Sequence, residues 1–175
     1  MKYFIYLALL IILLALNSEF AAAFFSLPIR LNLLLLPVVF SALDNSQHDY
    51  LFLAFGAGLL LDLYNASPFG VWLFSFLLVG AFLSWIAKTF LVYKLDLKIV
   101  PILVLVAFAC TEALVIVFSK IFPGHENFSF EVVGALKRSV LTAPVEMALA
   151  LPAYFLWAWV LKLIAKTEVK KLSLK

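Results

Sequence analysis

Charged and sulfur-bearing side chains are scarce in this 175-residue chain. Asp, Glu, Lys and Arg make up 13% of the residues, against about 25% in soluble domains. Hydrophobic residues make up 66%, and so little polar surface cannot cover a soluble globule, which excludes a soluble enzyme. The single cysteine, Cys110, excludes an intrachain disulfide and a cysteine-based metal site. The aromatic content of 16% excludes a disordered chain, so the composition predicts a membrane protein.

Long apolar runs are what the chain has instead. A spanning helix needs about 20 apolar residues, and we predict six spans. They cover approximately residues 3–25, 31–43 (26–43 at most), 50–64, 69–87, 99–119 and 136–164. The second is short, so five spans with a re-entrant second segment are the alternative. No connection is long enough for a folded domain, and we expect one all-α integral membrane domain over residues 1–175 with a basic tail from about residue 165.

Basic residues indicate the orientation of these spans. Of the 13 Lys and Arg, nine fall in segments that are cytoplasmic if the N-terminus is inside, and four fall in the other segments. This bias predicts that both termini are cytoplasmic. Lys162, Lys166 and Lys170 are four residues apart and share one helical face. We interpret them as anchors on anionic lipid, with a partner-binding tail as the alternative.

The first apolar stretch has a second interpretation. Lys2, the following apolar run and Ala21-Ala22-Ala23 are compatible with a cleaved signal peptide. Because apolar character resumes at once and further spans follow, we favour an uncleaved first helix.

Carboxylic acids inside the predicted spans are the next informative feature, since an ionisable side chain costs about 2.5–3.5 kcal/mol at a helix centre. The acids are Glu19, Asp62, Glu112 and Glu146. They could line a proton or cation path or a polar pocket, or they could form hydrogen bonds between helices. We favour hydrogen bonds, because no histidine and no paired base lies at a comparable depth. Thr111 and Thr142 are potential hydroxyl partners, and Pro144 predicts a kink beside Glu146.

Catalytic and metal-binding patterns do not occur. His48 lies near Asp44 and Asp49, but no second histidine stands at ligand spacing. Walker, HExxH and GxSxG motifs are lacking. We therefore expect no enzyme activity, no metal and no cofactor.

Small residues recur at helix-packing spacing in three of the predicted spans. They are Ala8, Ala15 and Ala22 in the first, Ala54 and Gly58 in the third, and Ala109 and Ala113 in the fifth. Such residues let helix backbones approach closely in a membrane. They serve either packing within this chain or the docking of a partner's spanning helix.

The run Gly-Ala-Gly-Leu-Leu-Leu-Asp-Leu-Tyr-Asn-Ala-Ser-Pro-Phe-Gly at residues 56–70 resembles the signature of the MreD family of rod shape-determining membrane proteins. Its key positions are Gly56, Gly58, Asp62, Pro68 and Gly70. The physical logic of the motif is independent of the resemblance. Glycines permit close packing, the aspartate can satisfy the turn after the third span, and Pro68 and Gly70 favour a tight return.

The resemblance implies a non-catalytic subunit of the cell-elongation machinery in the bacterial plasma (inner) membrane. Proteins of this family pair with the single-span MreC, through its transmembrane and adjacent periplasmic region. They work with MreB, RodZ and the lateral-wall glycosyltransferase and transpeptidase, and no nucleic-acid partner is implied. They are also similar in fold to the S-components of energy-coupling-factor vitamin transporters.

Two other functions remain alternatives. A true S-component would bind a vitamin, although the predicted outward loops are poor in the polar groups that a hydrophilic ligand needs. A proton-coupled carrier would use Glu112 and Glu146, although the chain shows no inverted repeat.

Overall fold

The computed structural model describes residues 2–23, 32–44, 49–65, 68–90, 99–121 and 132–172, and within these ranges all regular structure is helical. The helices are α1 (Lys2–Ala23), α2 (Leu35–Leu43), α3 (Asp49–Tyr64), α4 (Val71–Phe90), α5 (Val100–Ile121) and α6 (Val132–Leu172). This confirms the predicted all-α class.

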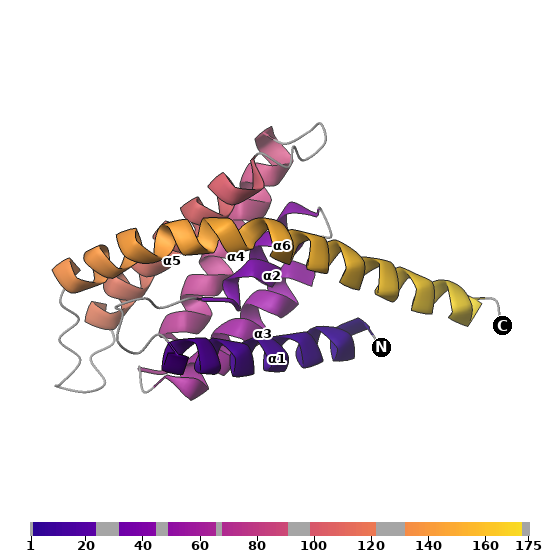
Figure 1. The fold of residues 1–175 in the computed structure, drawn as a ribbon, viewed down its shortest axis with the longest axis horizontal. Helices are drawn as coiled ribbons and strands as arrows, with labels where there is room; N and C mark the ends of the chain where they lie inside the picture. The colour runs from indigo at the N-terminus through magenta and orange to yellow at the C-terminus, as the bar shows by residue number, and fades with distance from the viewer. Residues whose placement is uncertain are drawn as a thin grey trace.

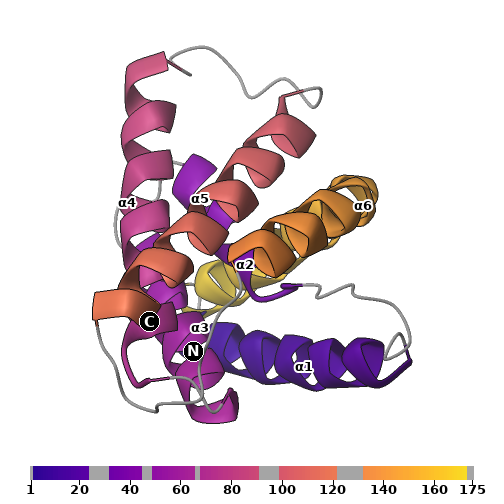
Figure 2. The same cartoon turned by 90° about the vertical axis from the view of Figure 1, so that its left-hand side faces the viewer.

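The helices surround α2, which lies in the middle of the bundle (Figures 1 and 2). It contacts α3, α4, α5 and α6, while α1 packs on α3. Every residue of α2 is buried. A helix that is apolar on all sides is stable only when protein or lipid surrounds it completely, and here four neighbouring helices do so.

The length of α2 bears on the predicted second span. Its nine residues cover about 13.5 Å at 1.5 Å per residue, less than half of a bilayer core of about 30 Å. The described part of this segment is therefore shorter than the predicted span and favours the re-entrant alternative. Residue 31, with which the predicted span begins, and residues 26–30 of its longest form lie outside the described residues.

Three helices are long and apolar enough to cross a membrane among the residues described. Their spanning parts are Val71–Thr89, Val100–Phe118 and Pro144–Ala165, and Lys2–Ser18 is a shorter apolar helix. Large apolar side chains such as Phe4, Phe82 and Phe155 are exposed on the outer surface. Such a surface suits contact with lipid rather than water.

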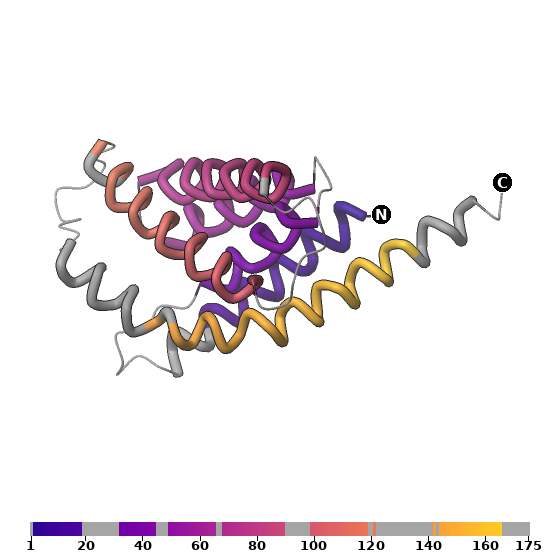
Figure 3. Tube along the Cα trace, turned by 90° about the horizontal axis from the view of Figure 1, so that it is seen from above, coloured from indigo at the N-terminus to yellow at the C-terminus, as the bar shows by residue number. Residues whose placement is uncertain are grey.

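Two helices continue through residues that commonly interrupt an apolar helix. Helix α1 includes the polar residues at 17–19, where the Ser18 hydroxyl donates a hydrogen bond to the Ala15 carbonyl oxygen (2.7 Å). Helix α6 is longer than the predicted sixth span and continues through Pro144 and Pro152 as one bent helix (Figure 3). Membrane helices tolerate proline where neighbouring groups satisfy the freed carbonyl.

Candidate functional site

Asp62, near the end of α3, holds the start of α4. Its carboxylate is buried and accepts three backbone hydrogen bonds: Oδ2 from the amides of Gly70 (2.9 Å) and Leu73 (3.1 Å), and Oδ1 from the amide of Trp72 (2.9 Å). The first amides of a helix have no intrahelical acceptor, and a negative charge there also interacts favourably with the helix dipole. Asp62 therefore acts as the N-terminal cap of α4 from a neighbouring helix.

Two glycines of the motif lie at close helix contacts. A Cβ at Gly58 would stand 2.5 Å from the Leu73 Cα, so the backbones of α3 and α4 meet there and leave no room for a side chain. A Cβ at Gly56 would meet only the Leu10 Cδ1 of α1, at 2.9 Å, which is the end of a rotatable side chain. The α3–α4 contact is therefore the stricter of the two.

The turn between these helices explains the last glycine. Gly70 has φ +100°, a backbone conformation that side chains disfavour. It directly precedes α4, and the Val71 amide donates to the Pro68 carbonyl oxygen at 3.4 Å. This backbone turn brings the Gly70 amide to the Asp62 carboxylate.

Glu146 of α6 makes the second long-range polar contact. Its Oε1 accepts a hydrogen bond from the backbone amide of Asn32 at 3.0 Å, and the carboxyl group is buried. The adjacent amide of Leu33 donates to the Asn17 Oδ1 of α1 at 3.5 Å. Side chains from α1 and α6 thus hold the chain where it leads into α2.

The other two predicted intramembrane acids are Glu112 and Glu19. Glu112 lies on α5, close enough to Glu146 for an electrostatic interaction. The Thr111 hydroxyl donates to the Ala107 carbonyl oxygen (2.8 Å) rather than to a carboxylate, which corrects its predicted role. The Glu19 side chain lies outside the described residues.

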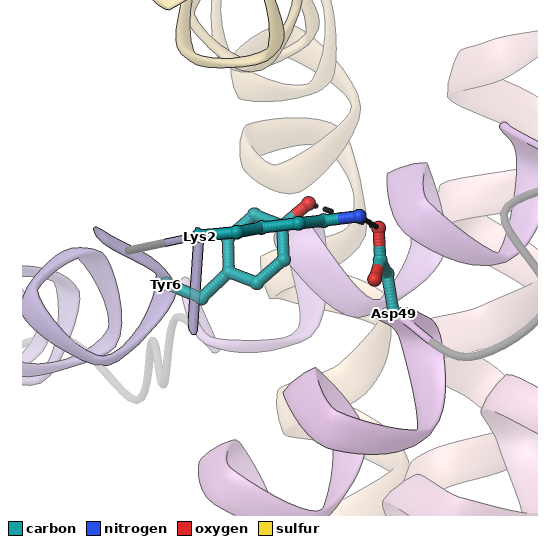
Figure 4. Close-up of polar contacts among 3 residues, drawn as sticks. All are labelled: Lys2, Tyr6 and Asp49. Carbon is teal, nitrogen blue, oxygen red and sulfur yellow. Dashed lines mark hydrogen bonds and ion pairs between the residues drawn. The ribbon is translucent and has the colours of Figure 1, made fainter. Parts of the chain in front are cut away.

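A third polar cluster joins the first turns of α1 and α3 (Figure 4). The buried Asp49 carboxylate forms an ion pair with Lys2 and accepts a hydrogen bond from the Tyr6 hydroxyl (3.1 Å). The Lys2 Nζ also lies 5.9 Å from the centre of the Tyr6 ring. Partial burial and the Asp49 carboxylate raise the pKa of nearby Asp44 above its usual range, while Lys2 opposes them.

An apolar groove of about 80 Å³ runs between α1, α2 and α6. We call it the α1–α6 groove; Leu9 and Leu13 of α1, Leu36 and Phe40 of α2, and Ala153 and Trp157 of α6 line it. The Trp157 indole stacks on the Tyr6 ring, with centroids 5.8 Å apart. Its Nε1 is buried and has no hydrogen-bond partner among the described residues.

The small residues divide into buried and exposed sets. Ala54 and Gly58 of α3 are buried within this chain, whereas Ala109 and Ala113 of α5 are exposed. Ala8 and Ala15 of α1 are also exposed, and the Ala22 side chain lies outside the described residues. Packing within the chain therefore uses the small face of α3 and leaves those of α5 and α1 on the outer surface.

Several predicted features fall partly or wholly outside the description. Lys162 is exposed, but the side chains of Lys166 and Lys170 are not described, nor is His48. Within the described ranges, no group of three or more His, Cys, Asp or Glu residues is arranged to hold a metal ion.

Sequence reasoning did not single out several of these polar residues. The roles of Tyr6, Asn32 and Trp157 depend on contacts between segments far apart in the chain, which no local pattern reveals. Asn17 is the point at which α1 contacts the chain leading into α2, through the hydrogen bond from the Leu33 amide.

Comparison with known proteins gives one result. No curated protein and no solved structure matches the chain, so the likeness to S-components stays a prediction. A family model described as rod shape-determining protein MreD matches residues 1–167, nearly the whole chain. The chain belongs to the MreD family of rod shape-determining membrane proteins.

Proposed function

We propose that this protein is a non-catalytic scaffold subunit of the bacterial cell-elongation complex. It binds the spanning helix and adjacent periplasmic region of MreC and so helps to control cell shape and lateral peptidoglycan synthesis. MreB, RodZ, the glycosyltransferase and the transpeptidase associate with it directly or through MreC. The chain forms one multi-pass domain in the inner membrane, with both termini and the basic tail in the cytoplasm.

The family match supports this proposal. The main structural support is that the buried acids form hydrogen bonds within the chain itself. Asp62, Glu146 and Asp49 each accept a hydrogen bond from another part of the same chain. Polar groups used in this way fix how helices pack in a membrane. A chain whose buried carboxylates hold its own helices suits a rigid platform for partners.

The same contacts argue against the S-component alternative. In transporters, the N-terminus of a short helix commonly receives an anionic group of the substrate. Here the Glu146 carboxyl group already accepts a hydrogen bond from the Asn32 amide, just before α2 begins. The α1–α6 groove, at about 80 Å³, is also far smaller than the roughly 300–1,000 Å³ of typical ligand pockets.

The exposed small face of α5 is the contact that we propose for the MreC spanning helix. Ala109 and Ala113 are one turn apart and exposed, and such a pair allows close approach of a second helix. The competing small face of α3 is already covered by α4, as the close contact at Gly58 indicates.

Co-purification in detergent with tagged MreC tests this function. Ala109→Leu should lower the retained MreC about tenfold, because a larger side chain at a close contact costs about 1–3 kcal/mol. Ala81→Leu is the matched control, since Ala81 is an exposed alanine on α4, and it should retain MreC. Cells depleted of the protein should become round, and the Ala81→Leu variant should restore rods.

Two results would contradict the proposal. Full MreC binding by a folded Ala109→Leu variant would remove α5 as the contact. Absence of any MreC binding, together with thermal stabilisation of the protein by a vitamin, would favour the S-component alternative.

A further inference from the structure

Helix α1 lies at the edge of the bundle, beside α3 (Figure 2). Of its side chains at residues 2–18, only Tyr6 and Leu10 are buried, and the others are half-buried or exposed. Large apolar side chains such as Phe4 and Ile12 lie on its outer surface. The α1–α6 groove leaves unfilled space on its α6 side. Helix α1 is therefore attached to the bundle mainly along one flank.

The apolar contact between α1 and α3 is made by side-chain tips. A Cβ at Gly56 would meet the Leu10 Cδ1, whereas a Cβ at Gly58 would meet the backbone of Leu73 in α4. Close approach of backbones is a main source of helix association in a membrane. The α3–α4 junction has such an approach, and the described contact at Gly56 is looser.

The bilayer changes what holds a helix of this kind. No hydrophobic force acts between helices in lipid, because lipid tails are as apolar as the side chains that they replace. Separating Leu10 from Gly56 therefore costs packing but exposes no apolar surface to water. As a result, polar contacts make up a larger share of the docking free energy of α1 than they would in a soluble protein.

The polar contacts of α1 converge on one carboxylate at its first turns. Asp49 of α3 forms an ion pair with Lys2 and accepts a hydrogen bond from the Tyr6 hydroxyl (Figure 4). We call these three residues the α1 latch. The Asp49 side chain is 6% exposed and that of Lys2 is 31% exposed, so the lysine stays within reach of solvent. Near the other end of α1, the Asn17 side chain accepts only a long hydrogen bond of 3.5 Å.

We propose that α1 is a releasable helix and that the α1 latch sets the fraction of molecules in which it has left α3. When the latch opens, the first turns of α1 move into lipid, while its C-terminal end stays joined to the chain that leads into α2. Release uncovers Gly56 on α3 and the flank of α2 at Leu36 and Phe40, which line the α1–α6 groove. Binding that requires this surface is weakened in proportion to the docked fraction.

This device goes beyond the scaffold function and does not depend on the MreC contact on α5. The packing of α2 to α6 remains as described, and α1 is the part that moves. The alternative is a permanently docked α1, for which the α1 latch contributes to the stability of the whole bundle and controls no separate motion.

Distances between spin labels in lipid nanodiscs test the proposal. In the full chain with Cys110→Ala, labelled cysteines replace Phe4 of α1 and Ala81 of α4, because both side chains are exposed. The intact latch should give one narrow distance distribution. Asp49→Asn should raise the ratio of released to docked α1 about 10- to 100-fold and so add a second, broader population, because bonds to a charged acceptor are lost.

Three controls separate release of α1 from general destabilisation. Asp44→Asn removes a neighbouring carboxylate that forms no hydrogen bond or ion pair among the described residues, and it should keep the single distribution. Labels at Ala81 and at Phe155, an exposed residue of α6, should keep their distance in every variant. With Lys2→Met and Tyr6→Phe already present, Asp49→Asn should have little further effect, because its partners are gone.

Either of two outcomes would overturn the proposal. One is an unchanged distribution between positions 4 and 81 in Asp49→Asn, because the α1 latch would then not control docking. The other is that Asp49→Asn broadens the distances between positions 81 and 155 as much as those between 4 and 81. In that case the variant would loosen the whole bundle, and α1 would not be a separate unit.

Discussion

Replacing Asp62 by asparagine should loosen the junction between α3 and α4. The carboxylate accepts three backbone hydrogen bonds, whereas asparagine has one acceptor oxygen. If that oxygen takes the place of Oδ2, it keeps the bonds from Gly70 and Leu73 in a weaker, neutral form. The side-chain NH₂ group of the asparagine then faces the Trp72 N–H, so two hydrogen-bond donors face each other and the Trp72 amide loses its acceptor.

The magnitude follows from the lost bond and the lost charge. A hydrogen bond to a charged acceptor is worth about 1.5–3 kcal/mol. A negative charge at a helix N-terminus adds about 0.3–1 kcal/mol. We therefore expect Asp62→Asn to lower the free energy of unfolding by about 2–4 kcal/mol, and Asp62→Ala to cost more, because every amide then loses its acceptor.

Two assays measure this effect in detergent micelles. Denaturant titration gives the free energy of unfolding, and hydrogen–deuterium exchange reports on the amides at 70–73. A local loss of about 2 kcal/mol should speed exchange there about 30-fold, while the middle of α5 should change little. Asp44→Asn is the comparison variant, since it also removes one carboxylate at a helix end but should stabilise rather than destabilise the protein at neutral pH. Equal stability of the two variants, with unchanged exchange at 70–73, would refute the capping role of Asp62.

The remaining predictions concern glycines and two other acids. Gly58→Ala should destabilise the protein by about 1–3 kcal/mol, because its Cβ would meet the Leu73 backbone. Gly56→Ala should be neutral or slightly stabilising, because only a side-chain tip must move and alanine favours the helix by about 1 kcal/mol. Glu146→Gln should keep the bond from the Asn32 amide and cost about 1 kcal/mol or less, whereas Glu146→Ala should cost about 2–4 kcal/mol through a buried, unpaired amide and a cavity. Asp44→Asn should raise the thermal midpoint at neutral pH and have no effect below about pH 4, because a carboxyl group whose pKa is raised in the folded state destabilises that state only when ionised.

Each of these has a contrary result. Equal stability of the Gly56→Ala and Gly58→Ala proteins would contradict the close backbone contact. A loss for Glu146→Gln as large as that for Glu146→Ala would show that charge, rather than the hydrogen bond, holds Asn32. A thermal midpoint that Asp44→Asn changes equally at pH 4 and pH 7 would contradict the raised pKa.

The helices themselves were largely predictable, because apolar runs of membrane length leave few alternatives. The predicted third, fourth and fifth segments differ from α3, α4 and α5 by only a few residues. The short second segment was ambiguous for a physical reason. Hydropathy measures how apolar a segment is, but the hydrophobic side chains of α2 face protein on all sides, and burial in protein and burial in lipid select the same residues.

The polar contacts were predictable only where both partners lie close in sequence. Asp62 and Gly70 are eight residues apart, so the turn motif pointed to their contact. Glu146 and Asn32 are 114 residues apart, and nothing near either residue identifies the other. The threonine predicted beside Glu112 bonds within its own helix instead, since a hydroxyl in a helix has a carbonyl within reach one turn earlier.

The burial of α2 also constrains how the protein is made. Helix α2 precedes in the chain the four helices that enclose it, and at about 13.5 Å it is too short to be inserted stably across a bilayer on its own. The Asn32 amide can donate its hydrogen bond to Glu146 only after the ribosome has added Glu146, late in synthesis. We therefore expect folding to end with the packing of α6 against α2 and the chain that leads into it, which were synthesised much earlier. A chain truncated before α6 should still be inserted into the membrane, but α2 should remain incompletely packed and the chain should be degraded more readily.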